Sequence, residues 1–330
     1  PTQGVLSAAT TDDHDVHSHR RSIVKPKSLG NKPAGDFTPF FRGWRMPSRV
    51  ASGLACDYTR SMAIDLQGRV IVITGASSGI GAAAAIACAK AGMDVVLGAR
   101  RVDKLEQVAS QVRQIGRRAV TAACDVTRDD DVNHLIDITL QTFGRLDVAY
   151  ANAGYGLFAS VLETPDEAVR AMFETNFHGT LRLLRAASVP MLKQGHGHLI
   201  ICSSAASEIS LPMYGVYAAT KAAQDSIAGA MRAEVAHRGL IVSSVHPIGT
   251  SSEFFESAKD RSNHSRFSHN TPASLTQTPQ QVAHAIVRCL RRPKAEVWPS
   301  PMTRFGLAIT TAFPGLAAWV MRRRANSRYS

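Results

Sequence analysis

Short apolar runs alternate with longer amphipathic stretches from residue 68 onward, and this alternation most constrains the fold. The apolar runs are rich in Val and Ile, which is typical of strands buried on both faces of a sheet. Stretches such as 103–116 and 130–144 are long enough for helices that cross between strands. The pattern predicts an α/β fold, a doubly wound parallel sheet flanked by helices on both faces. Strands are expected at 69–75, 94–100, 118–126, 146–154, 198–204 and 240–247.

The two ends of the chain differ from this body. Residues 1–61 are rich in Ser, Pro, Gly, Arg and His and lack sustained periodicity, which predicts a disordered N-terminal extension. Their apolar runs are too short for a secretory signal, and their aspartates disfavour a transit peptide. We expect one domain over 62–300, including a long polar loop at 249–278, and a C-terminal apolar segment with a basic tail at 301–330.

The formal charge of +12 raises the question of a polyanionic partner. Residues 1–61 and 321–330 carry +4 each, which leaves +4 for the body. Because the body also lacks a basic stripe interleaved with aromatic residues, nucleic-acid binding is not expected. The five cysteines are scattered without a C-x-x-C pair, so neither disulfides nor a zinc site is expected, and a reducing cytosol fits best. His14, His17 and His19 lie in the polar tail and are not expected to hold a metal.

A glycine-rich stretch, "TGASSGIG" at 74–81, follows the first expected strand and precedes an Ala-rich helix. Its glycines let the backbone turn tightly and approach a pyrophosphate, while the helix start offers free N–H donors and a positive dipole. The spacing differs from G-x-G-x-x-G, and a tight turn without a ligand is the alternative. We expect a dinucleotide to contact Gly75, Ser77, Ser78, Gly79, Ile80 and Gly81.

The choice of cofactor is expected at the end of the second strand, where an NAD site carries an acidic residue. This chain has Arg100 and Arg101 there, and guanidinium groups can grip a phosphate, so NADP(H) is favoured. A solvated helix start is the alternative for both arginines. Asp125, followed by Val126 at the end of the third strand, could reach the adenine or cap the next helix together with Thr127.

Two residues of "YGVYAATKAA", Tyr217 and Lys221, lie one helical turn apart, whereas Tyr214 lies two turns from the lysine. An ammonium nearby stabilises a phenolate and lowers its pKa, so the pair is predicted to be a tuned proton donor. Ser204 ends the fifth expected strand, and its hydroxyl could bond the oxygen that Tyr217 protonates. The alternatives are that Tyr217 is a packed helix aromatic, that Lys221 is a surface charge and that Ser204 is a strand-end cap.

Five motifs in order, "TGASSGIG", "ANAG" (151–154), "TNFHG" (175–179), "SSAAS" (203–207) and "YAATK" (217–221), resemble the short-chain dehydrogenase/reductase family over roughly residues 66–250. Five motifs are far more specific than a lone Y-x-x-x-K. The resemblance implies a single Rossmann-type domain with a seven-stranded parallel sheet. It also implies a catalytic set of Ser204, Tyr217, Lys221 and Asn176.

The same resemblance implies roles for single residues. Asn176 would anchor a water that links the lysine to solvent, and Lys221 would also bond the nicotinamide ribose. Asn152, with Ala153 and Gly154, would steady the central strand beside the cofactor.

The family usually has Pro-Gly after the sixth strand, whereas this chain reads "HPIGTSSEFF". The resemblance makes this segment, beginning with Pro247, a neighbour of the nicotinamide carboxamide. Ile248, Thr250 and Ser252 are the candidates for that contact, with their register open.

Residues 249–278 lie where the family places its substrate lid. Tyr155, Phe254 and Phe255 are candidate pocket walls, whereas His264 and His269 are expected to be solvated.

The stretch 305–321 is uncharged and runs into three arginines, but Pro314 and Gly315 divide it, so a spanning helix is not expected. Packing over the pocket or against another subunit is favoured over peripheral membrane contact through 305–324.

Together these features predict an NADP(H)-dependent oxidoreductase that transfers hydride between nicotinamide and a ketone, an aldehyde or a secondary alcohol. Ser204 would hold the substrate oxygen and Tyr217 would exchange a proton with it. One alternative is a non-catalytic NADPH-binding regulator of the same fold, and another is a membrane-surface lipid carbonyl reductase. We expect a small-molecule substrate, a homodimer or homotetramer, and a cytoplasmic location with membrane association as the alternative.

Overall fold

The computed structural model describes residues 63–209, 211–250, 258, 276–313, 315, 318–319 and 322. The predicted disordered extension lies outside the described residues, as does most of the predicted lid. The same holds for the candidates Ser252, Phe254, Phe255, His264 and His269 and for His14, His17 and His19.

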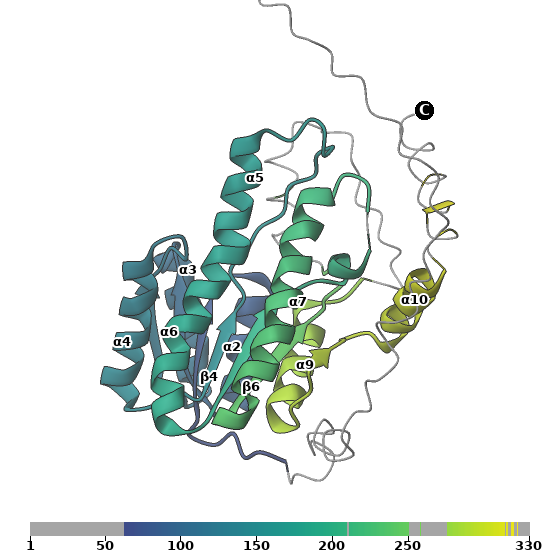
Figure 1. Ribbon diagram of the computed structural model, residues 1–330. Helices are drawn as coiled ribbons and strands as arrows, with labels where there is room; N and C mark the ends of the chain where they lie inside the picture. The colour runs from purple at the N-terminus through teal and green to yellow at the C-terminus, as the bar shows by residue number, and fades with distance from the viewer. Residues whose placement is uncertain are drawn as a thin grey trace, which may run out of the picture. The chain divides into compact units, whose positions relative to one another are not determined.

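Seven parallel strands form one sheet in the order β3-β2-β1-β4-β5-β6-β7 (Figure 1). This confirms the predicted doubly wound α/β fold with its seven-stranded parallel sheet. Six strands lie where the sequence predicts them, and the two-residue β7 is an addition that no apolar run signalled. The strands are β1 (Val70–Thr74), β2 (Asp94–Ala99), β3 (Ala119–Ala123), β4 (Val148–Ala151), β5 (Gly197–Cys202), β6 (Leu240–Val245) and β7 (Glu296–Val297).

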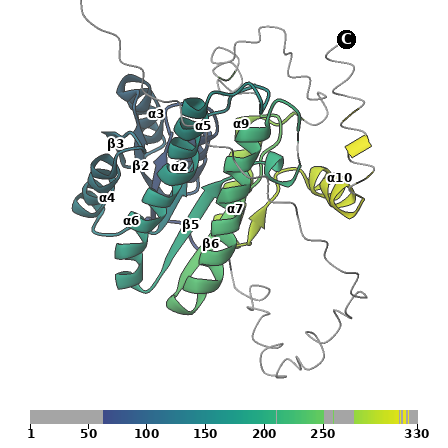
Figure 2. The same ribbon diagram turned by 45° about the horizontal axis from the view of Figure 1, so that its top comes forward.

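Helices cover both faces of the sheet (Figure 2). Successive side chains of a strand point to opposite faces, so Ile71 and Ile73 pack with one helical layer and Val70 and Val72 with the other. The first layer holds α2 (Gly79–Lys90), α3 (Val102–Gln114) and α9 (Pro279–Arg291). The second holds α4 (Asp129–Phe143), α6 (Gly179–Gln194) and α7 (Gly215–Val235).

The sheet changes winding direction between β1 and β4, which are neighbours although β2 and β3 separate them in sequence. In open parallel sheets this switch point leaves a crevice at the carboxyl ends of the strands, where ligands bind. Shorter elements close to that edge are α5 (Asp166–Phe173), the π-helical turn η2 (Glu174–His178) and the 3₁₀ turn η3 (Ala205–Glu208). The 3₁₀ turn η4 (Ala236–Arg238) ends α7 at the opposite edge.

Several strands are shorter than the sequence predicts, and the lost residues leave the sheet at this carboxyl edge. The predicted strand 198–204 ends at Cys202, because Ser204 instead caps η3 and accepts a hydrogen bond from Ala206 N at 3.1 Å. The predicted strand 146–154 ends at Ala151. Apolar runs therefore located the strands but overran the turns that build the site.

Helix α10 (Pro301–Ala312) is capped by Ser300, whose hydroxyl accepts a hydrogen bond from Thr303 N at 3.4 Å. Within the described residues, no helix combines the length and the hydropathy that crossing a bilayer requires.

Candidate functional site

A cavity of about 370 Å³ opens at the carboxyl edge of the sheet beside the switch point. It brings together most of the residues that the sequence singled out. From the first half of the chain it is lined by Gly75, Ser77, Ser78, Gly79, Ile80, Arg100, Arg101, Asp125, Val126, Asn152, Ala153, Gly154 and Tyr155. From the second half it is lined by Ser204, Tyr217, Lys221, Pro247 and Thr250. Residues not predicted there are Ala99, Cys124, Thr175, Cys202, Ser203 and Gly249.

Three predicted site residues do not line the cavity: Gly81, Asn176 and Ile248. A Cβ on Gly81 would overlap the carbonyl oxygen of Gly75, so this glycine allows α2 to approach the preceding turn closely. Ile248 uses its N–H to donate to Gln277 Oε1 at 3.1 Å.

The glycine-rich turn forms one end of the cavity. Gly75 has a φ of +65°, and a Cβ there would lie 2.8 Å from Ala153 Cα, so a side chain would collide with the neighbouring strand end. Ser78 precedes α2, and no described side chain caps the start of that helix or places an acid in its first turn. The first N–H groups of α2 are thus available to an anion.

Two arginines stand at this same end. Arg101 Nη2 donates to Ser77 Oγ at 3.0 Å and to Ser78 Oγ at 2.8 Å, which ties the end of β2 to the glycine-rich turn. Arg100 is exposed and lies close enough to Asp125 to lower the pKa of its carboxyl. The donors and cations at this end fit the phosphates of a nicotinamide dinucleotide.

Asp125 is held in a turn. Its Oδ1 accepts from Thr127 N at 3.0 Å and from Thr127 Oγ1 at 2.8 Å. Burial alone would raise the pKa of Asp125, but these hydrogen bonds and the nearby arginines lower it. The predicted alternative of a helix cap is wrong, because α4 starts only at Asp129 and its N-cap residue is Arg128.

Asn152 joins the ends of β4 and β1 at the centre of the cavity floor. Its Nδ2 donates to the carbonyl oxygens of Thr74 and Gly75, each at 3.1 Å. Thr74 Oγ1 in turn accepts from Asn152 N at 3.3 Å. These are the contacts that its predicted role, steadying the central strand, requires.

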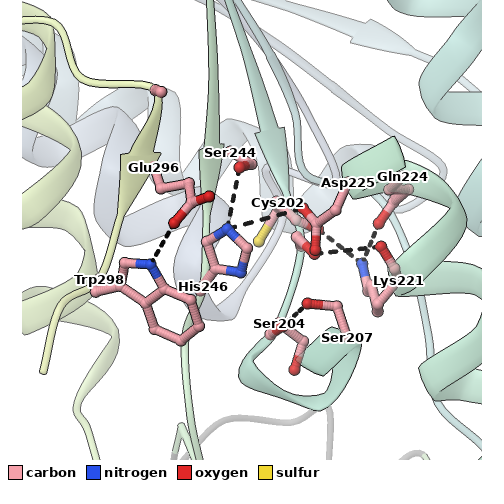
Figure 3. Close-up of polar contacts among 12 residues, drawn as sticks. Cys202, Ser204, Ser207, Lys221, Gln224, Asp225, Ser244, His246, Glu296 and Trp298 are labelled. Carbon is pink, nitrogen blue, oxygen red and sulfur yellow. Dashed lines mark hydrogen bonds and ion pairs between the residues drawn. The ribbon is translucent and has the colours of Figure 1, made fainter. Parts of the chain in front are cut away.

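Tyr217 and Lys221 lie on α7 at the other end of the cavity and are 8% and 4% exposed. Lys221 Nζ lies 5.6 Å from the centre of the Tyr217 ring and donates to Cys202 O at 2.7 Å (Figure 3). Ser204 hydrogen-bonds the Tyr217 side chain from the turn that follows β5. The serine, the tyrosine and the lysine therefore face one space.

The ionisation of this pair differs from the sequence prediction. Burial raises the pKa of Tyr217 above its usual 10, and the Ser204 hydrogen bond only partly offsets this. Burial lowers the pKa of Lys221, against the opposing influence of Cys202 and Asp225. The expectation of a lowered tyrosine pKa is thus wrong here, because desolvation by burial outweighs the Ser204 hydrogen bond. A protonated Tyr217 at neutral pH is suited to give a proton.

Asn176 lies behind the cavity in η2, fully buried. Its Oδ1 accepts from Tyr155 N at 2.9 Å, and its Nδ2 donates to Tyr155 O at 2.9 Å and to Thr220 Oγ1 at 3.1 Å. Its carbonyl oxygen accepts from Gln224 Nε2 at 2.6 Å. Gln224 also accepts from Lys221 Nζ at 2.9 Å, so its side chain joins the Asn176 carbonyl to the lysine, and the predicted water stays a prediction.

Sequence reasoning missed Gln224. The signal that could have found it is its position three residues after Lys221, on the same face of a helix. Its second contact joins residues 48 apart in sequence, which no local pattern indicates.

The other tyrosine of "YGVYAATKAA" packs beside Tyr217 but is not part of the cavity lining. Tyr214 does not line the cavity, and its ring packs edge-on against Phe158 with centroids 4.7 Å apart. The geometry thus favours Tyr217, as the spacing to Lys221 predicted.

A second buried cluster supports the segment that leads to Pro247. Ser203 Oγ donates to Asp225 Oδ2 at 2.8 Å, and Asp225 Oδ1 lies 3.7 Å from His246 Nε2 (Figure 3). The His246 ring stacks on Trp298 at 4.2 Å. Among the residues that the structure describes, no group of three or more His, Cys, Asp or Glu side chains could hold a metal ion.

Comparison with known proteins leads to the same family that the sequence motifs resemble. The family model described as short chain dehydrogenase matches residues 69–263. Glycine betaine reductase ATRR of Emericella nidulans is 34% identical over 229 residues, which are 69% of this chain but only 18% of that much longer relative. An uncharacterized oxidoreductase of Listeria innocua is 30% identical over 231 residues, 69% of this chain and 93% of the relative.

Solved structures are similar over the same region. A short-chain type dehydrogenase/reductase from Mycobacterium marinum has a TM-score of 0.65 at 30% identity, covering 71% of this chain and 94% of that one. An alcohol dehydrogenase from Thermococcus sibiricus, complexed with 5-hydroxy-NADP, has a TM-score of 0.61 at 29% identity, covering 70% and 96%. A Burkholderia phymatum relative in complex with NAD, at 22% identity and a TM-score of 0.68, covers 77% and 96% and is similar in fold.

Proposed function

The chain belongs to the short-chain dehydrogenase family, and on this premise we propose that it is an NADP(H)-dependent oxidoreductase acting on a ketone, an aldehyde or a secondary alcohol. The observation that carries the proposal is the convergence of Ser204, Tyr217 and Lys221 on the cavity that also holds the glycine-rich turn. A proton donor and a dinucleotide site in one cavity are what carbonyl reduction requires.

When bound, NADPH would supply the hydride that reduces the carbonyl carbon. The Ser204 hydroxyl bonds the substrate oxygen, and the Tyr217 hydroxyl gives that oxygen its proton as negative charge develops there. The Lys221 ammonium, held by Cys202 O, keeps positive charge beside the phenolate that remains. The reverse steps oxidise an alcohol.

The preference for NADP(H) is supported by the arginines at the end of β2. Arg100 and Arg101 both line the cavity, whereas Asp125 is the one acid among the described residues that line it. Asp125 follows β3, whereas the acid that bonds a ribose 2′-hydroxyl in an NAD site stands at the end of the second strand. The guanidinium groups suit a 2′-phosphate.

The test is a panel of ketones, aldehydes and secondary alcohols, followed through the near-ultraviolet absorbance of NADPH. We expect turnover with at least one carbonyl class, and a higher kcat/KM with NADPH than with NADH. Tight NADPH binding without turnover across the panel would favour the non-catalytic regulator instead.

A second candidate, a reductase working at a membrane surface, is favoured by one face of α10. The helix turns Thr303, which is 7% exposed, toward the body. Its bulky apolar residues Met302, Phe305 and Ile309, spaced along one face, are 76%, 71% and 41% exposed. An exposed apolar stripe of this kind needs a covering surface.

The charges around that stripe point to an anionic lipid surface. Arg304 pairs with Glu296 at 3.6 Å, but after Glu296 the chain has no acidic residue, and the arginines at 322–324 and 328 add only positive charge. We expect the chain to sediment with vesicles containing phosphatidylserine, and Phe305→Ser to reduce this several-fold while turnover stays intact. Equal binding by both proteins, or a change in oligomeric state without vesicle binding, would contradict this candidate.

A further inference from the structure

We propose that Gln224 is a positioning residue of the active site, whose side-chain amide holds the Lys221 ammonium and fastens it to the backbone of Asn176. This inference rests on the proposed function, because the lysine belongs to the same site. It assigns a role to a residue outside every motif quoted above. It also closes one route between the lysine and solvent.

Gln224 lies one helical turn beyond Lys221 on α7, and it is 0% exposed. Its Oε1 accepts from Lys221 Nζ at 2.9 Å (Figure 3). Its Nε2 donates to Asn176 O and to Thr180 Oγ1, each at 2.6 Å. The amide thus bridges three elements: α7, the π-helical turn η2 and the first turn of α6.

The partners determine which way the amide faces. A lysine ammonium can only donate hydrogen bonds, and a backbone carbonyl can only accept them. Turning the amide of Gln224 over would set its NH₂ against the ammonium and its oxygen against the carbonyl of Asn176. Both bonds would be lost at a fully buried side chain, which is costly. The side chain therefore keeps one orientation, and Lys221 is held with it.

The same contacts occupy the carbonyl of Asn176. That oxygen accepts from Gln224 Nε2 and from Thr180 Oγ1 at 2.7 Å, which uses both of its lone pairs. A neutral amide also lacks a titratable group that could take up and release a proton. Gln224 therefore offers no proton route from Lys221 through the carbonyl of Asn176.

Lys221 keeps one N–H donor for the cavity. Two of its three N–H groups point to Cys202 O and Gln224 Oε1, and within the described residues the third has no protein partner. The ionisable groups that face Lys221 are Tyr217 and Asp225 of its own helix and Cys202 of β5.

The first test is Gln224→Met, which keeps the volume and removes both ends of the bridge. We expect kcat to fall about tenfold or more, because the lysine loses its fixed position. We also expect the dissociation constant for NADPH, measured by fluorescence titration, to rise several-fold. The matched control is Gln194→Met, because the Gln194 amide also bonds backbone groups, those of Leu146, but far from the cavity. Equal kinetics and affinity in wild type and a folded Gln224→Met would overturn the proposal.

The second test separates positioning from a structural role through Gln224→Glu. A carboxylate there still accepts from Lys221 but adds negative charge beside Tyr217, which disfavours the phenolate. Reduction should therefore persist to higher pH, with the alkaline limb of the kcat profile moved upward. A limb that stays in place in this variant would show that position 224 does not act through the lysine and tyrosine.

A third readout needs no turnover and no cofactor. Thermal unfolding of Lys221→Met, Gln224→Met and the double variant forms a double-mutant cycle. Because the two side chains bond each other, the double variant should lose less stability than the two single losses added together. Additive losses would overturn the proposal even if no substrate were found, whereas a carbonyl panel without turnover would count against the proposed function alone.

Discussion

The two ends of the cavity hold their positive charges in opposite ways. Arg100 and Arg101 stand at the exposed rim, and Arg101 reaches across to the serine hydroxyls of the glycine-rich turn. Lys221 is 4% exposed and is fixed by a backbone carbonyl and a buried amide. An exposed cation contributes modestly and is screened by salt, whereas a buried one depends on each of its partners. The rim is therefore suited to selecting a cofactor, and the buried end to chemistry.

The largest expected effect is at the buried end. Tyr217→Phe removes one hydroxyl that is the proposed proton donor, so kcat for carbonyl reduction should fall about 1000-fold. The NADPH dissociation constant, measured by titration, should change little, because the ring and Lys221 remain. Tyr214→Phe is the matched control, since that ring packs on Phe158 outside the cavity, and it should retain nearly full turnover. Equal losses in the two variants would contradict the assignment.

A smaller effect is expected at the rim. Arg100→Asp replaces a cation that suits a 2′-phosphate with an acid that suits a 2′-hydroxyl. The ratio of kcat/KM for NADPH over NADH should fall about 100-fold and reverse the preference, with kcat itself little changed. Added salt should weaken NADPH binding by the wild type more than by this variant. An unchanged ratio would place the phosphate elsewhere.

The smallest expected effect concerns His198, a buried histidine at the amino end of β5, away from the cavity. Burial lowers the pKa of His198 to about 3, and its Nε2 pairs with Ser243 Oγ at 2.8 Å. The unfolded chain, with a histidine pKa near 6.5, binds this proton first, so the free energy of unfolding should drop as pH falls below about 6.5. Between pH 7 and pH 5 the loss is about 2 kcal/mol.

Denaturant unfolding at both pH values measures this loss. His198→Gln keeps a donor that can reach Ser243 in place of the imidazole Nε2, without titrating, and should show a shallower dependence on pH. His134→Asn, at an exposed position of α4, should keep the wild-type dependence. A slope shared by all three proteins would show that His198 is not the group responsible.

Residues close together in sequence allowed much of the site to be predicted, but not the buried residues that hold it in place. The glycine-rich turn, the arginines after β2 and the pairing of Tyr217 with Lys221 all follow from neighbours in sequence, because helices and turns fix those distances. Gln224 and the carbonyl of Asn176 meet only when α7 packs against η2, so no local pattern revealed that contact. The raised pKa of Tyr217 also escaped prediction, because it depends on burial by the whole fold.

The fold could be predicted because it too depends mainly on local sequence patterns. Runs of Val and Ile mark strands that both helical layers cover, and their alternation with helices determines the parallel sheet. β7 has only two residues and follows α9 without an apolar run, so its place beside β6 depends on tertiary packing.

Hydride transfer is tested most directly by the fate of a label. NADPH carrying deuterium at C4 of its nicotinamide ring would be incubated with the wild-type chain and an accepted carbonyl compound, and the alcohol analysed by mass spectrometry. We predict one deuterium on the former carbonyl carbon, and almost no labelled alcohol with Tyr217→Phe. The experiment is run with deuterium on each face of the nicotinamide ring in turn. Alcohol that carries no deuterium in either run, or oxidised cofactor without any alcohol, would contradict the account.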